Sequence, residues 1–175
     1  MMNKGLEIIE AFWLFDIPAS DIEVIIHPQS IIHSLVEYID GSTLAQLGNP
    51  DMRTPIAYAL SHPERIESGV SGLDLIKTQK LDFEAPDLNK FPCLGLAYKA
   101  LNMGHNAPTV LNAANEVAVD AFLNESIGFN QIAELIEFCM DTVESQSIDS
   151  IDTVLDIDKK TRYLALKWID SHKLS

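Results

Sequence analysis

The sequence predicts an α+β fold: a partial mixed or antiparallel sheet with helices, followed by a small C-terminal four-helix bundle. Three observations support this prediction. Asp40-Gly41, a strong hairpin signal, separates two β-type segments. Four amphipathic helical patterns follow one another after Pro92. Between these two regions, residues 62–91 show no sustained periodicity. With 175 residues, of which 47% are apolar and 22% charged, the chain can bury a core in one or two domains.

The first element is a helix. Residues 4–15 are rich in helix formers, and Pro18 bounds the segment on its C-terminal side. Residues 22–26 are almost entirely apolar and β-branched, which predicts a strand that ends at Pro28.

Residues 31–39 and 42–47 form the two arms of the predicted hairpin, so the sheet is at least partly antiparallel. Alternation along the arms places Val36, Tyr38 and Leu44 on one face and Glu37 on the other. A helix follows, with Thr54 as its N-cap and Pro55 at its first position.

Residues 62–91 predict an extended connector, because Pro and Gly recur through them and only Leu81–Phe83 suggests a short strand. A structureless stretch of that length argues for a domain boundary. The predicted division is therefore residues 1–61, a linker at 62–91, and residues 92–175.

The last region predicts four helices joined by short loops, which is the pattern of a small bundle. They are expected at Pro92–Met103, ending at Gly104; at Thr109 to about Asn124; after Asn130 as cap; and from Asp156 or Ile157 onward.

The charge balance excludes some function classes. The chain has 26 acidic and 12 basic residues, a formal charge of −14, and residues 134–158 contain eight carboxylates with no Lys or Arg. Nucleic acids and anionic membranes both require cationic protein surface, so neither is expected as a partner. The acidic stretch is interpreted as a solubility feature.

Nothing in the sequence predicts export or membrane insertion. No apolar run approaches the roughly 20 residues of a membrane span, and the start lacks the pattern of a signal peptide. Cys93 and Cys139 lie within helical apolar patterns and are expected to be free thiols in a reducing compartment. A cytoplasmic location is predicted.

Asn3, Lys4 and Glu7 form the candidate chemical site, because their spacing places all three on one helical face. An amide and a lysine suit phosphate oxygens, and a carboxylate suits a hard divalent cation. One carboxylate and one lysine make neither a complete metal site nor a complete phosphate site, so we expect the other members outside these 175 residues. The plain alternative is an i, i+3 surface ion pair worth a few tenths of a kcal/mol.

Several segments, in order along essentially the whole chain, resemble the C-terminal portion of 1-deoxy-D-xylulose 5-phosphate reductoisomerase. They are Met1–Glu7, His27–Ser34, Asp40–Ser42, Leu47–Pro55 and Leu111–Glu116. The resemblance implies that residues 1–61 are part of a catalytic and dimerisation domain. Residues 62–91 would then be the extended linker and 92–175 the C-terminal helical bundle domain.

The resemblance also implies a function. The family converts 1-deoxy-D-xylulose 5-phosphate to 2-C-methyl-D-erythritol 4-phosphate in non-mevalonate isoprenoid biosynthesis. It uses NADPH and Mg2+, Mn2+ or Co2+, and works as a homodimer through the sheet. The glycine-rich NADPH-binding turn, the remaining metal ligands and the loop that closes over substrate are missing here. The fragment alone is therefore expected to bind neither cofactor and to be inactive.

Residue roles transfer only where the motifs match. Glu7 resembles a metal-site carboxylate that also contacts substrate, and Asn3 and Lys4 resemble two further substrate ligands. Asn3 is expected near the phosphate and the sugar hydroxyls, and Lys4 near the phosphate or the metal-bound oxygens.

His33 resembles a histidine that is important for activity and is the catalytic candidate, with a hydrogen-bonded structural role as its alternative. Pro50 and Met52 resemble residues on the nicotinamide side of the site. Asp51 is interpreted as a turn or capping residue, and Arg53 as the partner of a nearby carboxylate.

Two other functions remain open at this point. A non-catalytic dimerisation or scaffold module would use the sheet edge at residues 31–47 as its interface. A metal-dependent phosphosugar hydrolase is less well supported, because Asp16 and Asp21 flank a turn and follow no ligand spacing.

Overall fold

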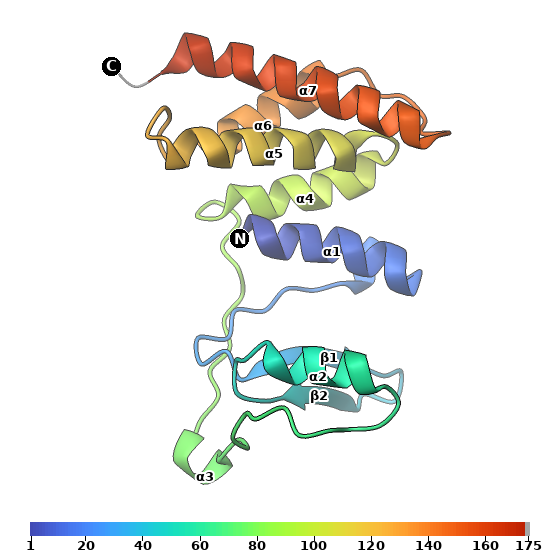
Figure 1. Ribbon diagram of the computed structural model, residues 1–175, viewed down its shortest axis with the longest axis vertical. Helices are drawn as coiled ribbons and strands as arrows, with labels where there is room; N and C mark the ends of the chain where they lie inside the picture. Colours follow the sequence, from blue (N-terminus) through green and yellow to red (C-terminus); the bar gives the residue numbers. More distant parts are fainter. Residues whose placement is uncertain (174–175) are drawn as a thin grey trace. The chain divides into compact units, whose positions relative to one another are not determined.

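The structure, a computed structural model, describes residues 1–173 and contains helices and one small sheet (Figure 1). Its contacts form two compact units, residues 25–86 and residues 1–24 together with the chain from residue 87 onward. This grouping differs from the predicted boundary at residues 62–91. The cause is the N-terminal helix, which packs with the C-terminal helices. The assignment of folding domains stays a prediction.

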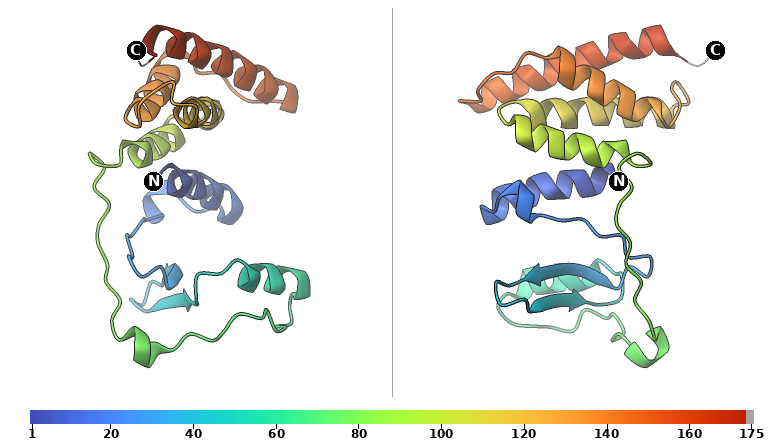
Figure 2. Two further views of the ribbon diagram at one scale, coloured as in Figure 1. Left: turned by 60° about the vertical axis from the view of Figure 1, so that its left-hand side comes forward. Right: turned by 180° about the vertical axis from the view of Figure 1, so that it is seen from behind.

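The first unit is helical. In sequence order its α-helices are α1 (Met2–Phe15), α4 (Pro92–Met103), α5 (Ala107–Leu123), α6 (Gln131–Thr142) and α7 (Ile151–His172), with a short 3-10 helix, η1 (Ala19–Asp21), after α1. Helix α5 packs against α4, α6 and α7, and α1 packs against α4, as the views in Figures 1 and 2 agree. The largest fully buried side chains are Leu94, Leu111, Ile127, Leu135, Ile136 and Ile157.

Helix α1 approaches α4 closely because Gly5 has no side chain at the contact. A Cβ atom at Gly5 would lie 2.6 Å from the Cβ of Ala97, much nearer than real carbon atoms approach. Ile8, one turn further along, is only 2% exposed. The sequence predicted α1 as a helix but not its place on the bundle.

The predicted bundle helices are present, with some corrections to their ends. Helix α4 has its predicted bounds, and the N–H of Gly104, at φ 64°, donates to the carbonyl of Ala100 at 3.0 Å. Asn130 precedes α6 but its side chain makes no cap hydrogen bond. Helix α5 begins at Ala107, two residues before the predicted Thr109.

The predicted start of the last helix at Asp156 or Ile157 is wrong. Helix α7 begins at Ile151, because the Oγ of Ser150 accepts a hydrogen bond from the N–H of Thr153 at 3.1 Å. Asp152 in the first turn adds a carboxylate where the helix dipole favours negative charge.

The second unit contains an antiparallel pair of strands, β1 (Ile32–Glu37) and β2 (Thr43–Leu47). Val36 pairs with Leu44, so these two share a face as predicted. In the turn, Gly41 has φ 82° and Asp40 Oδ1 accepts from the N–H of Ser42 at 2.9 Å. Helices α2 (Arg53–Ser61) and α3 (Leu75–Thr78) complete the unit.

Two further predictions of local structure are wrong. Residues 22–26 form no strand; only Ile26 pairs, in an isolated bridge with Glu84 at N–O distances of 2.8 and 2.9 Å. Helix α2 begins at Arg53 and not after a Thr54 cap, because Asp51 Oδ1 accepts from the N–H of Arg53 at 2.9 Å.

Burial differs sharply between the units. No residue of the segment 25–86 is buried, whereas α4, α5 and α6 each bury several. The hairpin exposes large apolar side chains, including Leu35, Val36, Tyr38, Ile39 and Leu44. The second unit therefore has no hydrophobic core of its own.

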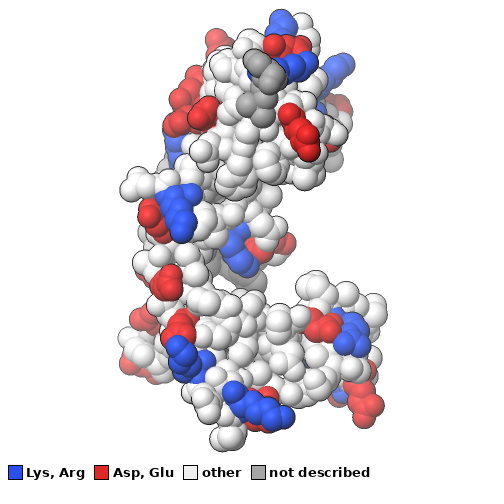
Figure 3. All heavy atoms as spheres, turned by 90° about the vertical axis from the view of Figure 1, so that its left-hand side faces the viewer, with Lys and Arg blue, Asp and Glu red and all other residues white. Residues whose placement is uncertain are grey.

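Both thiols are free as expected, and Cys139 on α6 is fully buried. Within residues 1–173, no helix combines the length and the apolar character needed to cross a membrane. On the face shown in Figure 3, acidic and basic side chains are interspersed and no extended basic area forms.

Candidate functional site

Asn3, Lys4 and Glu7 meet on α1 as their spacing predicts. The Nζ of Lys4 donates to Glu7 Oε2 at 2.6 Å, and the Nδ2 of Asn3 donates to Glu7 Oε1, also at 2.6 Å. Both carboxylate oxygens are therefore engaged by neighbours on the same helix. The three side chains are exposed, with 53% of Lys4 and 45% of Glu7 accessible.

The three polar side chains are exposed because α1 packs against the bundle through its opposite face. Gly5 and Ile8 are buried in the contact with α4, and the polar residues three and four apart occupy another face. In this state the trio is the i, i+3 ion pair considered as the plain alternative, with the amide of Asn3 added.

As a metal site the trio is incomplete. Glu7 offers hard oxygen donors that suit Mg2+ or Mn2+, but an octahedral cation needs more than one carboxylate. Across residues 1–173, no group of three or more His, Cys, Asp or Glu side chains is placed to hold a metal ion. Glu7 can thus supply one ligand of a site whose other ligands come from elsewhere.

His33, Pro50 and Met52 belong to the other compact unit. His33 lies on β1, and its Nε2 is 3.2 Å from the carbonyl oxygen of Gly48, which follows β2. With Nε2 protonated, this hydrogen bond ties the strand to the start of the loop at residues 48–52. Pro50 and Met52 are both exposed on this loop, Met52 by 70%.

Arg53 pairs with a carboxylate as predicted, and the partner is Asp51. The Nε of Arg53 lies 3.0 Å from Asp51 Oδ1, and one terminal guanidinium nitrogen lies 2.7 Å from Oδ2. These hydrogen bonds from Arg53 lower the pKa of Asp51 to about 2, so the carboxylate is ionised at every physiological pH. Asp51 Oδ1 also accepts from the N–H of Arg53, the first residue of α2, at 2.9 Å, while Met52 occupies the N-cap position.

The ring of His27 contacts residues of the segment around Asp82. Its Nδ1 is 2.8 Å from the carbonyl oxygen of Asp82, and its ring stacks on Phe83 with centroids 5.1 Å apart.

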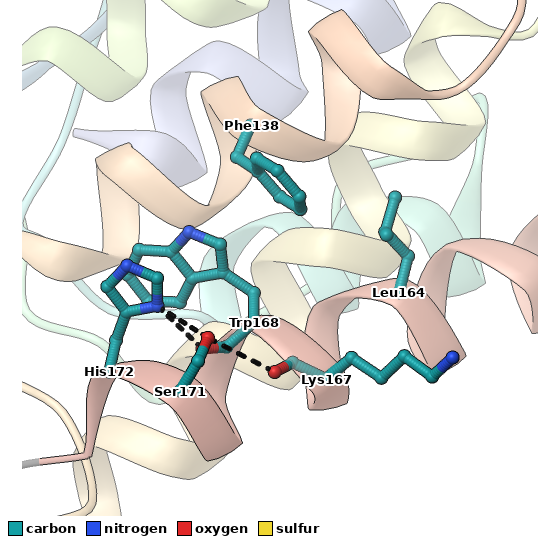
Figure 4. Close-up of a pocket in the computed structure, with 6 residues that line it drawn as sticks. All are labelled: Phe138, Leu164, Lys167, Trp168, Ser171 and His172. Atoms are coloured by element: carbon teal, nitrogen blue, oxygen red, sulfur yellow. Dashed lines mark hydrogen bonds between the residues drawn. The ribbon is translucent and has the colours of Figure 1, made fainter.

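The structure also contains a surface depression of about 410 Å³ on α6 and α7, which the sequence did not indicate (Figure 4). In Figure 4 the ring of His172 lies against the indole of Trp168, with centroids 4.0 Å apart and planes inclined by 7°. None of the predicted site residues lines this depression; its lining is Phe138, Leu164, Lys167, Trp168, Ser171 and His172.

Comparison with known protein families gives a match to the DXP reductoisomerase C-terminal domain over residues 47–164. A curated relative, 1-deoxy-D-xylulose 5-phosphate reductoisomerase of Methylobacillus flagellatus, is 60% identical over 168 residues, covering 96% of this chain and 43% of the relative. The enzyme of that name from Acidithiobacillus ferrooxidans is 61% identical over 172 residues, covering 98% of this chain and 44% of the relative.

Solved structures agree. The reductoisomerase of Zymomonas mobilis in complex with NADPH matches with a TM-score of 0.92 and 50% identity, covering 97% of this chain and 45% of that one. A reductoisomerase in complex with NADPH, fosmidomycin and magnesium matches with a TM-score of 0.91 and 50% identity, over 97% of this chain and 44% of that one. The chain thus spans less than half the length of these relatives. Within that length, the family match and the identities show that it belongs to the 1-deoxy-D-xylulose 5-phosphate reductoisomerase family.

Proposed function

We propose that this chain is the C-terminal part of an NADPH- and divalent-metal-dependent reductoisomerase that converts 1-deoxy-D-xylulose 5-phosphate to 2-C-methyl-D-erythritol 4-phosphate. The reaction belongs to non-mevalonate isoprenoid biosynthesis. The observation that carries the proposal is about 60% identity to enzymes of that name over nearly the whole chain. Relatives have been solved with NADPH and with magnesium, which supports both cofactors.

Asn3, Lys4 and Glu7 would bind the substrate. Lys4 provides a point charge for phosphate oxygens, and the amide of Asn3 can donate to phosphate or sugar oxygens. Since both are hydrogen-bonded to Glu7 here, they would exchange that carboxylate for substrate oxygens. Fixing the charged end of the substrate holds the reacting carbons in place.

Glu7 would provide one oxygen ligand of the metal site. When bound, the divalent cation supplies Lewis acid chemistry at the substrate oxygens. The remaining protein ligands would come from polypeptide outside this chain.

Pro50 and Met52 would line the nicotinamide. Their exposed apolar side chains suit the face of a ring that must be positioned while the cofactor itself provides the hydride. His33 would be the catalytic residue on this side of the site. Its hydrogen bond to the carbonyl oxygen of Gly48 would also orient the loop at residues 48–52.

We further propose a cytoplasmic homodimer that associates through the sheet. The support is the hairpin, whose two strands have no further strand partner among residues 1–173 and whose apolar side chains Leu35, Val36 and Leu44 are exposed. The same surface favours the second candidate function, a non-catalytic dimerisation module.

One experiment separates these functions. The 175 residues are expressed alone, and also joined to the preceding part of the Methylobacillus flagellatus relative. NADPH oxidation is then measured with 1-deoxy-D-xylulose 5-phosphate and Mn2+. We expect turnover only from the joined protein. The Glu7→Gln variant of that protein should lose at least about 100-fold in kcat/KM, because a metal ligand is removed.

Glu10→Gln is the matched control, since Glu10 is an exposed glutamate on the same helix. It should retain normal turnover. A folded joined protein without turnover would refute the enzyme function and leave the dimerisation module. Turnover by the 175 residues alone would show that no further polypeptide is needed.

A further inference from the structure

We propose that Asn49 and Asp51, with Arg53, are positioning residues that hold Pro50 and Met52 outward toward the nicotinamide. This inference rests on the proposed function, because it assigns the residues that shape the cofactor-facing loop. It goes beyond the predicted contacts, since these three side chains are not expected to touch the cofactor themselves.

The first observation is an alternation along the loop. Asn49 and Asp51 are half-buried and hydrogen-bonded within their own unit, whereas Pro50 and Met52 between and after them are exposed. Residue 50 lies at a bend and Met52 at a turn, with φ −64° and ψ −18°. Anchoring Asn49 and Asp51 fixes the backbone that carries Pro50 and Met52, and so fixes where these two side chains lie.

The second observation is a tie between the loop and a distant segment. The Nδ2 of Asn49 donates to the carbonyl oxygen of Ser71 at 2.7 Å, across 22 residues of sequence. Arg53 approaches the same segment, with one terminal nitrogen 3.5 Å from the carbonyl oxygen of Gly69. The Arg53 contact is long, so Asn49 makes the firmer tie.

The third observation is the geometry at Asp51. Its carboxylate accepts three kinds of donor from Arg53, namely the backbone N–H at 2.9 Å, Nε at 3.0 Å and a terminal nitrogen at 2.7 Å. A paired, two-point contact of this type fixes orientation as well as distance. Met52 lies between these two residues, so its backbone is held from both sides.

The fourth observation is that the loop is also held where it begins. The N–H of Gly48 donates to the carbonyl oxygen of Ile31 at 3.0 Å, and His33 Nε2 lies 3.2 Å from the carbonyl oxygen of Gly48. With the beginning fixed to β1 and the end fixed to α2, little freedom remains for Pro50 and Met52. Their apolar side chains are thus preorganised for a flat ring.

The test uses a complete reductoisomerase that contains these 175 residues. Asp51→Asn keeps an oxygen that can accept from the N–H of Arg53 but removes the charge that pairs with the guanidinium group. We expect it to raise the KM for NADPH about tenfold, because misplaced contacts lose productive alignment, with the KM for the phosphosugar changed less than about twofold. The Kd of NADPH, measured by fluorescence, should rise in parallel.

Asp74→Asn is the matched control. Asp74 likewise accepts hydrogen bonds from backbone N–H groups at the start of a helix in this unit, those of Ile76 and Lys77, and it pairs with the Lys77 ammonium at 3.5 Å. It should lower the melting temperature about as much as Asp51→Asn does while leaving both KM values unchanged. An equal rise in the KM for NADPH in both variants would show that Asp51 acts only through stability.

A double-mutant cycle identifies the pair. Arg53→Gln alone should produce most of the rise in the KM for NADPH. The double variant, Asp51→Asn with Arg53→Gln, should show little further rise, because either single substitution already removes the interaction between the two side chains. If the Asp51 variants fail to fold, Asn49→Ala replaces them, and it should also raise the KM for NADPH. An unchanged KM for NADPH in Asp51→Asn would overturn the inference, whereas a folded wild-type enzyme that oxidises no NADPH with the phosphosugar would overturn the proposed function beneath it.

Discussion

Cys139 shows how burial changes the chemistry of a single side chain. It is 0% exposed on α6, and this burial raises the pKa of its thiol from 9.0 to about 12. Between these two values the unfolded chain has lost the proton while the folded chain keeps it. The unfolded state then binds fewer protons, so the free energy of unfolding must fall as pH rises.

We therefore expect the protein to lose stability above pH 9 relative to Cys139→Ala, by up to about 1.4 kcal/mol per pH unit. Denaturant unfolding of both proteins at pH 8 and pH 10.5 measures this difference. The cavity left by the alanine shifts its curve equally at both pH values, and Cys93 is present in both proteins. Two curves that run parallel from pH 8 to pH 10.5 would contradict the effect of burial.

For single residues, the sequence predicted the side-chain pairs whose members lie a few positions apart in the chain. The hydrogen bonds of Asn3 and Lys4 to Glu7 span four and three residues, respectively, and the Arg53 pair with Asp51 spans two. Asn106 was missed because its partners are distant. Its buried amide donates to the carbonyl of Glu144 at 2.9 Å and accepts from the N–H of Gln146 at 3.2 Å.

Gly5 decides how closely two elements pack, α1 and α4. Gly5→Ala would place a methyl group 2.6 Å from the Cβ of Ala97, so the helices must separate or shift. We expect a loss of about 1–3 kcal/mol in the free energy of unfolding. Thermal or denaturant unfolding of the 175-residue chain measures it.

Gly95→Ala on α4 is the control, because nothing lies within 4 Å of a Cβ added there. It should stabilise the chain by about 0.5–1 kcal/mol, as expected for replacing glycine inside a helix. If Gly5→Ala stabilised the chain as much, the close contact between α1 and α4 would be wrong.

Elements were predictable where their signals are local. The hairpin followed from Asp40-Gly41, and α4 followed from Pro92 and Gly104, because turn and cap chemistry acts within a few residues. Residues 22–26 failed as a strand because β propensity is satisfied only when another strand pairs alongside, and only Ile26 has such a partner here.

For the whole molecule, the two compact units differ in what holds them together. The helical unit has a continuous core, while residues 25–86 contain no buried residue. An isolated two-stranded hairpin is marginally stable in water. We therefore expect the amides of α5 and α6 to exchange hydrogen slowest in the 175-residue chain and those of β1 and β2 to exchange with little protection.

Hydrogen exchange followed by mass spectrometry on the 175-residue chain tests this. Protection of the hairpin equal to that of α5 would show that residues 25–86 are stabilised by something other than a core. The joined protein provides the comparison, since covering the exposed face of the hairpin should slow its exchange.

The sequence by itself determined the α+β class, the four helices after Pro92, the hairpin and the common face of Asn3, Lys4 and Glu7. Each of these follows from periodicity or from interactions over a few residues, which the order of amino acids encodes directly. Only the tertiary structure decided that α1 packs on α4 through Gly5, and that Asn49 reaches Ser71. Such features depend on which surfaces meet when the chain folds, and that depends on close packing between residues far apart in the sequence.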